Sequence, residues 1–299
     1  MFRFRKILFP VDFSDRCTAM LPYVGDLADR LRADLDFLHV LEESGAPGKL
    51  WRQREIDLAA FAAQIPKGLN CPQMVAYGTP AQTVARYARN RAVDIVALPS
   101  NDRWAPDSVA RDVLRQVSCA VWTGSVAGHP HMRWSPIVCA VDLQQGSEQV
   151  VSYASALAET FHASLVVVHA VSDIAEDSWR RSSRWPAVSS RKGGQRKLER
   201  LLQDLNVSAE PVVQTGSVEE VVGFAAKQAS AELLVVGRGM QGESSLGAHT
   251  YELVRNSQCP VVACPRQPVR SECFWTEWQQ DHSGAGTEAS LEQTSGIAC

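Results

Sequence analysis

The sequence predicts an α/β protein built from two tandem doubly wound domains, each a parallel sheet sandwiched between helices. Short apolar runs rich in β-branched residues alternate with amphipathic helical stretches along the chain. This order is typical of parallel sheets whose two faces are both covered. The same order of elements occurs twice within the 299 residues, and such a repeat indicates an internal duplication.

Five buried strands are expected in the first half, over residues 6–11, 35–40, 74–77, 94–98 and 120–123. Helices are expected between them, over residues 15–32, 51–65, 80–90 and 107–117. Ser14 is the expected N-cap of the first helix. Residues 79–82, with proline at the first helical position, predict a capping box, and Ser217 with Glu220 predicts a second one 138 residues later.

The second half repeats the landmarks of the first at a nearly constant spacing. Asp142 follows Asp12 by 130 residues, and His169 follows His39 by the same number. Strands are expected over residues 137–141, 165–169, 233–236 and 261–264, with a helix over 248–256. His39 and His169 fall in apolar strands, so we expect satisfied core histidines rather than ligands.

The chain is therefore divided into a first domain over 1–124, a linker over 125–135, a second domain over 136–267 and a tail over 268–299. The linker is polar and turn-rich, and the polar, aperiodic tail is expected to be disordered. Residues 172–194 are interpreted as a solvated loop or lid edge, with a phosphate-reaching basic arm as the lesser alternative. The domains are expected to pack as a pseudo-dimer through the strands 120–123 and 261–264, because pairing removes an exposed apolar edge.

Composition excludes several classes of protein. A net charge of −3 gives no reason to expect binding to nucleic acid or to an acidic membrane. Pro10 and Asp12 interrupt the N-terminal apolar run, which is then too short for a signal peptide. The eight cysteines lack Cys-x-x-Cys spacing, so we expect buried reduced thiols in a cytoplasmic protein.

The stretch 235–263 carries the strongest functional signal. Glycines 237, 239, 242 and 247 lie between an expected strand and an expected helix. Free N–H groups at such a loop and helix N-terminus form an anion site. The alternative is a permissive turn without a ligand. A dinucleotide fingerprint is rejected, because the strand that follows, 261–264, carries no acidic residue.

Two Val-Asp pairs, the Leu-His-Val and Val-His-Ala strand ends, and a glycine loop leading to Cys-Pro-Val-Val resemble a tandem universal stress protein over residues 4–265. The resemblance implies one UspA-type domain in each half, with an adenine nucleotide alpha hydrolase-like fold. It also implies that ATP lies across the carboxyl ends of the strands, which agrees with the rule for open parallel sheets.

The sequence departs from the family's phosphate motif, Gly-x2-Gly-x9-Gly-Ser/Thr. Met240 stands at the second glycine, the loop spans 10 positions instead of 13, and Ala248 replaces the hydroxyl residue. We expect weakened phosphate binding. In the first half Pro99 and Asp107 take the places of the first and last glycines. Because they remove a donor and add a repelling charge, we expect that half not to bind nucleotide.

The resemblance implies a role for individual residues of the second half. Asp142 would contact the adenosine end, Ala170 the adenine, and Thr250 would supply a hydroxyl to phosphate. Asp142 has an equally weighted alternative as a turn or N-cap residue at a strand end. The full expected set is Ala140, Asp142, Ala170, Val236, Gly237, Gly239, Gly242, Gly247, Ala248, His249 and Thr250.

The sequence thus predicts a cytoplasmic stress-response protein that binds ATP or another adenine nucleotide in its second half. Protein partners and a homodimer are compatible with this reading. No nucleophile elbow, Walker loop or paired-histidine metal helix occurs, so we expect neither an enzyme nor a resident metal, with Mg²⁺ only alongside ATP. The alternatives are a nucleotide-free interaction module and, with less support, a slow ATPase.

Overall fold

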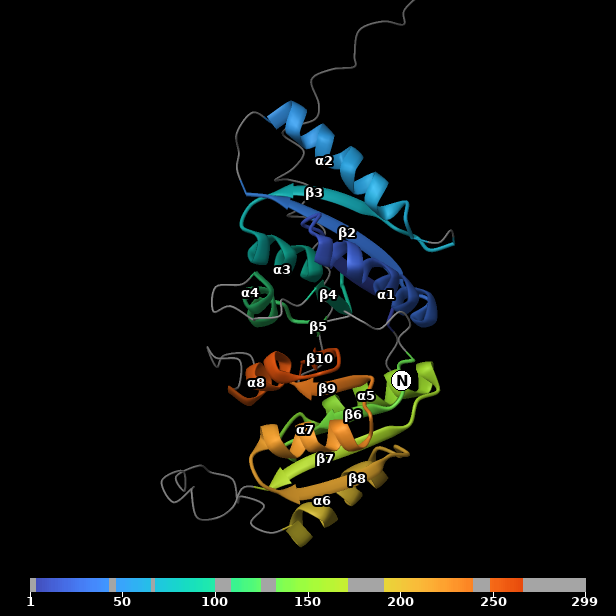
Figure 1. The fold of residues 1–299 in the computed structure, drawn as a ribbon, viewed down its shortest axis with the longest axis vertical. Helices are drawn as coiled ribbons and strands as arrows, with labels where there is room; N and C mark the ends of the chain where they lie inside the picture. Colours follow the sequence, from blue (N-terminus) through green and yellow to red (C-terminus); the bar gives the residue numbers. More distant parts are fainter. Residues whose placement is uncertain are drawn as a thin grey trace, which may run out of the picture.

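The computed structural model describes residues 4–42, 47–65, 68–99, 109–124, 133–171, 191–238 and 248–265. Strands and helices alternate through both halves (Figure 1). The first half contains β1 (Lys6–Pro10), α1 (Asp15–Leu31), β2 (Asp34–Leu41), α2 (Pro47–Ala62), β3 (Gln73–Tyr77), α3 (Pro80–Asn90), β4 (Ile95–Pro99), α4 (Val109–Gln116) and β5 (Ala120–Gly124). The second contains β6 (Ile137–Ala140), α5 (Ser147–Phe161), β7 (Leu165–Val171), α6 (Arg191–Asp204), β8 (Glu210–Thr215), α7 (Val218–Gln228), β9 (Leu233–Gly237), α8 (Ala248–Asn256) and β10 (Val261–Cys264).

All ten strands form one sheet, in the order β3-β2-β1-β4-β5-β10-β9-β6-β7-β8. Pairing is parallel within each half, which confirms the predicted doubly wound α/β fold. The two halves join where β5 pairs antiparallel with β10, in the register Thr123 with Val261, Trp122 with Val262 and Val121 with Ala263. The predicted pairing of the fifth strands is therefore confirmed.

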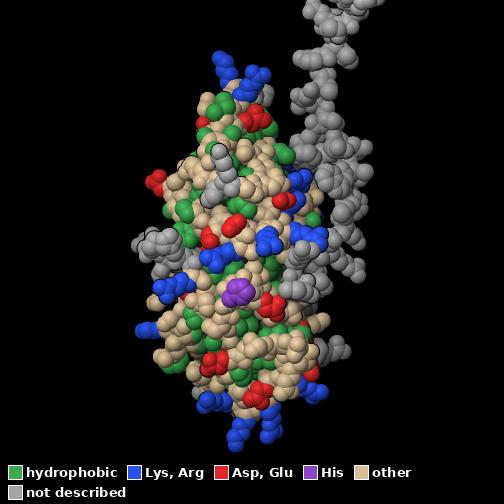
Figure 2. All heavy atoms as spheres, turned by 90° about the vertical axis from the view of Figure 1, so that its right-hand side faces the viewer, with side chains coloured by type: hydrophobic (Ala, Val, Ile, Leu, Met, Phe, Trp, Pro, Cys, Tyr) green, Lys and Arg blue, Asp and Glu red, His purple; other side chains and the backbone are tan. Residues whose placement is uncertain are grey.

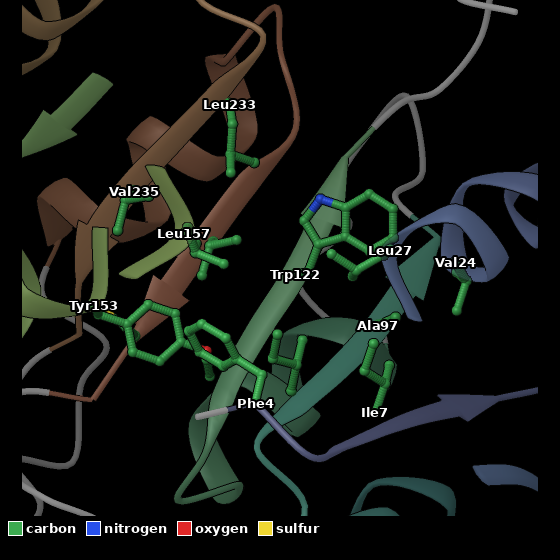
Figure 3. Packing of buried hydrophobic residues seen from close by; sticks show 14 of the residues in the cluster. Phe4, Ile7, Val24, Leu27, Ala97, Trp122, Tyr153, Leu157, Leu233 and Val235 are labelled. Carbon is green, nitrogen blue, oxygen red and sulfur yellow. The ribbon is translucent and has the colours of Figure 1, made fainter. Parts of the chain in front are cut away.

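The hydrophobic core continues from one half into the other on both faces of the sheet. On the face covered by α1 and α5, the rings of Phe4 and Tyr153 meet edge to face at 4.9 Å between centroids. Trp122 of β5 is buried on the same face, with apolar side chains of both halves around it (Figure 3). Because the strands are covered on both faces, they read as nearly continuous apolar runs in the sequence.

Two of the three predicted N-caps form as expected. Ser14 accepts a hydrogen bond from the backbone N–H of Cys17, and Ser217 accepts one from that of Glu220. The Glu220 carboxylate accepts its bond from the Ser217 hydroxyl, at 2.8 Å. Thr79 occupies the N-cap position of α3, but its side chain makes no capping bond. The capping box predicted over residues 79–82 is therefore wrong, although the helix starts where expected.

The end of the linker is more ordered than its composition predicts. Trp134 is 1% exposed and lies between the halves. Its ring stacks on Phe161 at 4.8 Å and lies 5.4 Å from the Trp122 ring. Its indole N–H donates to the Asp26 carboxylate at 2.6 Å. Residues 125–132 lie outside the described part of the chain, but Trp134 corrects the expectation of a wholly polar linker.

The predicted loop over residues 172–194 is wrong at its C-terminal end, because α6 already begins at Arg191. The Arg191 guanidinium donates to the carbonyl of Val213 in β8. Gly194 lets α6 approach the sheet closely, since a Cβ there would lie 3.1 Å from Val213 and 3.2 Å from His169. Residues 172–190 and the tail, 268–299, lie outside the described residues.

Basic and acidic side chains are interspersed over the described part of the face in Figure 2. Among the described residues, no helix combines the length and apolar character that a membrane span needs.

Replacing Trp134 with alanine should destabilise the protein by about 3–5 kcal/mol, the usual cost of removing a large buried aromatic side chain. Trp134→Phe keeps the ring stack and loses the bond to Asp26, so its cost should be about 1 kcal/mol. Chemical denaturation of both variants measures the two losses. Equal losses would show that packing between the halves contributes nothing beyond the hydrogen bond.

Candidate functional site

The two ends of the expected site meet at a topological switch point. Strand β6 pairs with β7 on one side and with β9 on the other, so the helices that follow β6 and β9 diverge. Ala140 at the end of β6 lies opposite Val236 in β9. Asp142 then follows β6, and Gly237 ends β9. Ligands of open α/β sheets bind in the crevice at this position.

Asp142 builds the turn that follows β6. Its Oδ1 accepts hydrogen bonds from the Gln144 N–H at 3.0 Å and from the Ser147 hydroxyl at 3.1 Å. Leu143 between them adopts a left-handed conformation with φ 58°. A short polar side chain that bonds two residues ahead is typical of such turns. The alternative role of Asp142, as a turn residue, is therefore present in the structure.

The first half contains the same turn. Asp12 Oδ1 accepts from the Ser14 N–H at 2.9 Å, and Phe13 has φ 59°. Burial opposes ionisation of Asp12, but hydrogen bonds from Cys17 and Ser14 outweigh it and lower the pKa of the carboxyl. The left-handed conformation is sterically unfavourable for residues other than glycine. The turn is a built feature of both halves and does not by itself distinguish a binding half from a non-binding one.

The two strand histidines bond backbone carbonyls, as expected of satisfied residues, with His169 buried in the core and His39 half-buried. His39 Nδ1 lies 2.7 Å from the Val11 carbonyl, and His169 Nδ1 lies 2.9 Å from the Val141 carbonyl. Burial lowers the pKa of both imidazoles, so each is neutral at physiological pH. Both hold β1 or β6 against its neighbouring strand.

The N-terminus of α8 is attached to the end of β9. Thr250 is buried, and its hydroxyl donates to the Gly237 carbonyl at 2.9 Å. This bond aligns the first turn of α8 with the strand end, and the N–H groups of a first helical turn have no acceptor within the helix. The hydroxyl proton that was expected to meet a phosphate is already committed to Gly237.

Sequence analysis missed Arg238, which is 7% exposed and connects the site to the other half. Its guanidinium donates to the carbonyls of Leu114 at 2.7 Å, Val117 at 2.9 Å and Cys119 at 2.5 Å. These carbonyls lie at the end of α4 and before β5, where a helix leaves acceptors unsatisfied. Because the acceptors are backbone groups, no side-chain pattern in the sequence could have revealed this contact.

His249, the second residue of α8, bridges to α7. Its Nδ1 donates to the Glu219 carboxylate at 2.7 Å. Burial raises the pKa of Glu219, but the hydrogen bond from His249 outweighs that effect and lowers it. At pH values above the ordinary pKa of a glutamate, the bridge contributes its full stabilisation. That contribution is lost as the pH falls through the lowered pKa of Glu219.

The structure places most of the expected residues at one edge of the sheet. Residues 140, 142, 236 and 237 and the first turn of α8 lie there, and Ala170 lies near the end of β7, paired with Gln214 of β8. Gly239, Gly242 and Gly247 lie outside the described residues. No described group of three or more His, Cys, Asp or Glu side chains could hold a metal ion.

The described cysteines are poor nucleophiles. Cys17, Cys119, Cys139 and Cys264 are buried, and no described cysteine forms a disulfide. Burial raises the pKa of Cys17 and of Cys119 to about 12. A thiol needs a lowered pKa to react at neutral pH, so these side chains are structural.

Replacing His249 with alanine should raise the pKa of Glu219, because the desolvation remains after the hydrogen bond is lost. An NMR titration of the Glu219 carboxyl carbon measures the shift. His162→Ala, at the end of α5, is the matched control and should leave the titration unchanged. An unaltered Glu219 pKa in His249→Ala would contradict the bridge.

Comparison with known proteins agrees with the fold and with its duplication. The family model described as "Universal stress protein family" matches residues 3–123 and again 133–265. A universal stress protein from Archaeoglobus fulgidus DSM 4304 is similar in structure, with a TM-score of 0.71 at 16% identity, and the match covers 89% of this chain and 100% of that one. A functionally unknown protein from Pseudomonas aeruginosa PAO1 gives a TM-score of 0.64 at 14% identity, covering 88% and 92%.

A comparison with curated proteins found no match. At these identities the solved structures support the fold alone. The family model, however, covers both halves of the chain, each over a complete set of five strands. The chain therefore belongs to the universal stress protein family, as a tandem member with two family domains.

Proposed function

We propose that this protein acts in the stress response and binds an adenine nucleotide, ATP, ADP or AMP, at the carboxyl edge of its second half. The observation that carries the proposal is the position of Gly237 and the α8 N-terminus. Both lie at the switch point between β6 and β9, and the Thr250 bond holds them in register. Unpaired N–H groups and the positive end of a helix favour a phosphate there.

The first half is the weaker candidate for the same ligand. Pro99 ends β4 at the position that Gly237 has at the end of β9. Proline offers no N–H and brings a ring to the place where the backbone would approach phosphate. The two halves share the aspartate turn, so this strand end is what favours the second half.

Affinity is expected to be modest. The Thr250 hydroxyl already donates to Gly237, so a phosphate would have to compete with that bond. Ala248 offers no hydroxyl in its place. A hydrogen bond to a charged group contributes about 1.5–3 kcal/mol, equivalent to a factor of about ten or more in affinity. ADP or AMP therefore suits the site as well as ATP does.

A regulatory role is favoured over catalysis. The buried cysteines are protonated, and His249 is engaged by Glu219. Catalysis of phosphoryl transfer to water needs a group that orients or activates the water. Mg²⁺ would accompany ATP and be held mainly by the phosphates.

Calorimetric titration with ATP, ADP and AMP tests the proposed site. Gly237→Val should abolish binding, because a branched side chain fills the space at the strand end. Asp142→Ala should weaken binding, whereas Asp142→Asn keeps an acceptor for the turn and should lose less. Asp12→Ala is the matched control in the other half and should bind as the unaltered protein does. Loss of binding in Asp12→Ala alone would place the site in the first half and contradict the proposal.

Thr250→Val should weaken nucleotide binding and lower stability by about 1 kcal/mol, because the bond that aligns α8 with β9 is lost. Thr250→Ser keeps the hydroxyl and should preserve both properties. Titration and thermal denaturation of the pair measure the effect. Unaltered affinity in Thr250→Val would show that the alignment of α8 does not matter for the ligand.

A further inference from the structure

The duplicated fold contains one helix pair that is closed in the first half and open in the second. Helix α3 packs closely on α4, whereas α7 and α8, at the equivalent places (Figure 1), leave a groove of about 560 Å³ between them. Its floor is apolar and includes Val222, Leu234 and Leu253. The groove therefore has the size of a binding site for a small ligand or a peptide side-chain row.

Matched positions explain why the second pair is open. Val93 and Val117 follow α3 and α4, are 3% and 4% exposed, and belong to the hydrophobic cluster that contains side chains of both helices. Ala231 and Ser257 stand at the equivalent positions of the second half and are partly exposed. Each replacement removes apolar volume from the seam between the helices, and an apolar seam that is not filled stays open to solvent. The smaller residues of the second half therefore account for the groove.

A further small residue widens the groove. Ala85 is buried between α3 and α4, but its equivalent, Gly223, is exposed and a Cβ there would meet nothing within 4 Å. Glycine inside a helix costs stability relative to alanine. The loss brings no close helix contact at this position, in contrast to Gly194 of α6. The missing side chain at Gly223 instead leaves space in the groove.

The charges around the groove define what can occupy it. Among the described residues that line it, Glu219, Glu232 and Glu252 are acidic and Lys227 alone is basic. Glu219 already accepts a hydrogen bond from His249. An occupant that complements both the floor and the rim carries an apolar row flanked by basic groups. Peptides present such a row as helical residues at i, i+3, i+4 and i+7. Helix α8, the shorter wall, has 9 residues, so a partner helix would lie along about 13 Å of it, between two and three helical turns.

We propose that the α7–α8 groove is a docking site for a basic amphipathic helix of a partner protein. The groove lies on the face of α7 and α8, apart from the crevice between β6 and β9. Among its described lining residues, only the side chain of Glu219 bonds a side chain of the expected nucleotide set, that of His249. Apolar side chains of the partner lie on Val222 and Leu253, and its lysines or arginines face Glu232 and Glu252.

The full-length protein can be tested with two synthetic 14-residue helical peptides. Both carry leucines at i, i+3, i+4 and i+7, one with lysines and the other with glutamates elsewhere. The lysine peptide should bind at least tenfold more tightly, by fluorescence anisotropy, and should shift NMR signals of α7 and α8. Gly223→Leu adds a side chain to the groove at a position where a Cβ would meet no atom within 4 Å, so it should weaken binding about tenfold with no fall in melting temperature.

Charge reversal supplies the specificity test. Glu232→Lys with Glu252→Lys should reverse the preference in favour of the glutamate peptide. Glu199→Lys with Asp204→Lys reverses two exposed charges of α6, outside the groove, and is the matched control, with affinity within about twofold of the unaltered protein. Equal binding of both peptides, or a Gly223→Leu variant that binds as before, would overturn the proposal. Self-association that Gly223→Leu abolishes, seen by sedimentation, would make a second copy the occupant and would overturn it too.

Discussion

The antiparallel pairing of β5 with β10 is the interaction on which the rest of the molecule depends. Both strands are buried, so each would be an apolar edge without the other. The pairing turns two five-stranded sheets into one sheet of ten strands. It also lets the two hydrophobic cores run across the junction on either face. Neither half could leave this position without exposing both cores.

On each face of the sheet, a buried side chain connects the two halves at the junction. On the side of α1, Trp134 fills the space between the halves and bonds to Asp26. On the side of α4, Arg238 satisfies three carbonyls of the first half, and Arg111 lies over the Tyr251 ring at 5.5 Å. A buried arginine loses hydration, and multiple hydrogen bonds offset that loss. The end of β9 is thus attached to the neighbouring half as well as to its own helix.

Apolar periodicity in the sequence predicted nine of the ten described strands, all but β8, and most of the helices, because it is a local property. The repeat spacing and the apolar edge of the fifth strand in each half predicted the junction. Helix α8 and strand β10 have the predicted bounds. Hydrogen bonds of individual side chains to distant residues were not predictable. The bond from Trp134 spans 108 residues, and those of Arg238 end on backbone atoms. The start of α6 was missed because its first residues are basic and glycine-rich, a composition that also suits a loop.

The candidate site was predictable in part. The strand ends and the helix start follow from the fold, so Asp142, Gly237 and Ala248 could be placed at one edge from sequence. The partner that each polar group selects could not be. Thr250 bonds the strand end, Asp142 bonds its own turn, and His249 bonds Glu219. Proteins satisfy buried polar groups internally wherever they can, and the sequence does not say which neighbour will do so.

Joining the halves in one polypeptide changes what the junction can become. Only eight residues, 125–132, separate the described parts of the two halves, and a short tether holds its ends at an effective concentration on the order of millimolar. The junction therefore re-forms in a unimolecular step and does not weaken on dilution. In a symmetric dimer every substitution appears twice, but here one side can change alone. Arg238 has Ser100 as its counterpart in the sequence of the first half. The arginine contact across the junction is therefore made once per molecule, from the second half to the first.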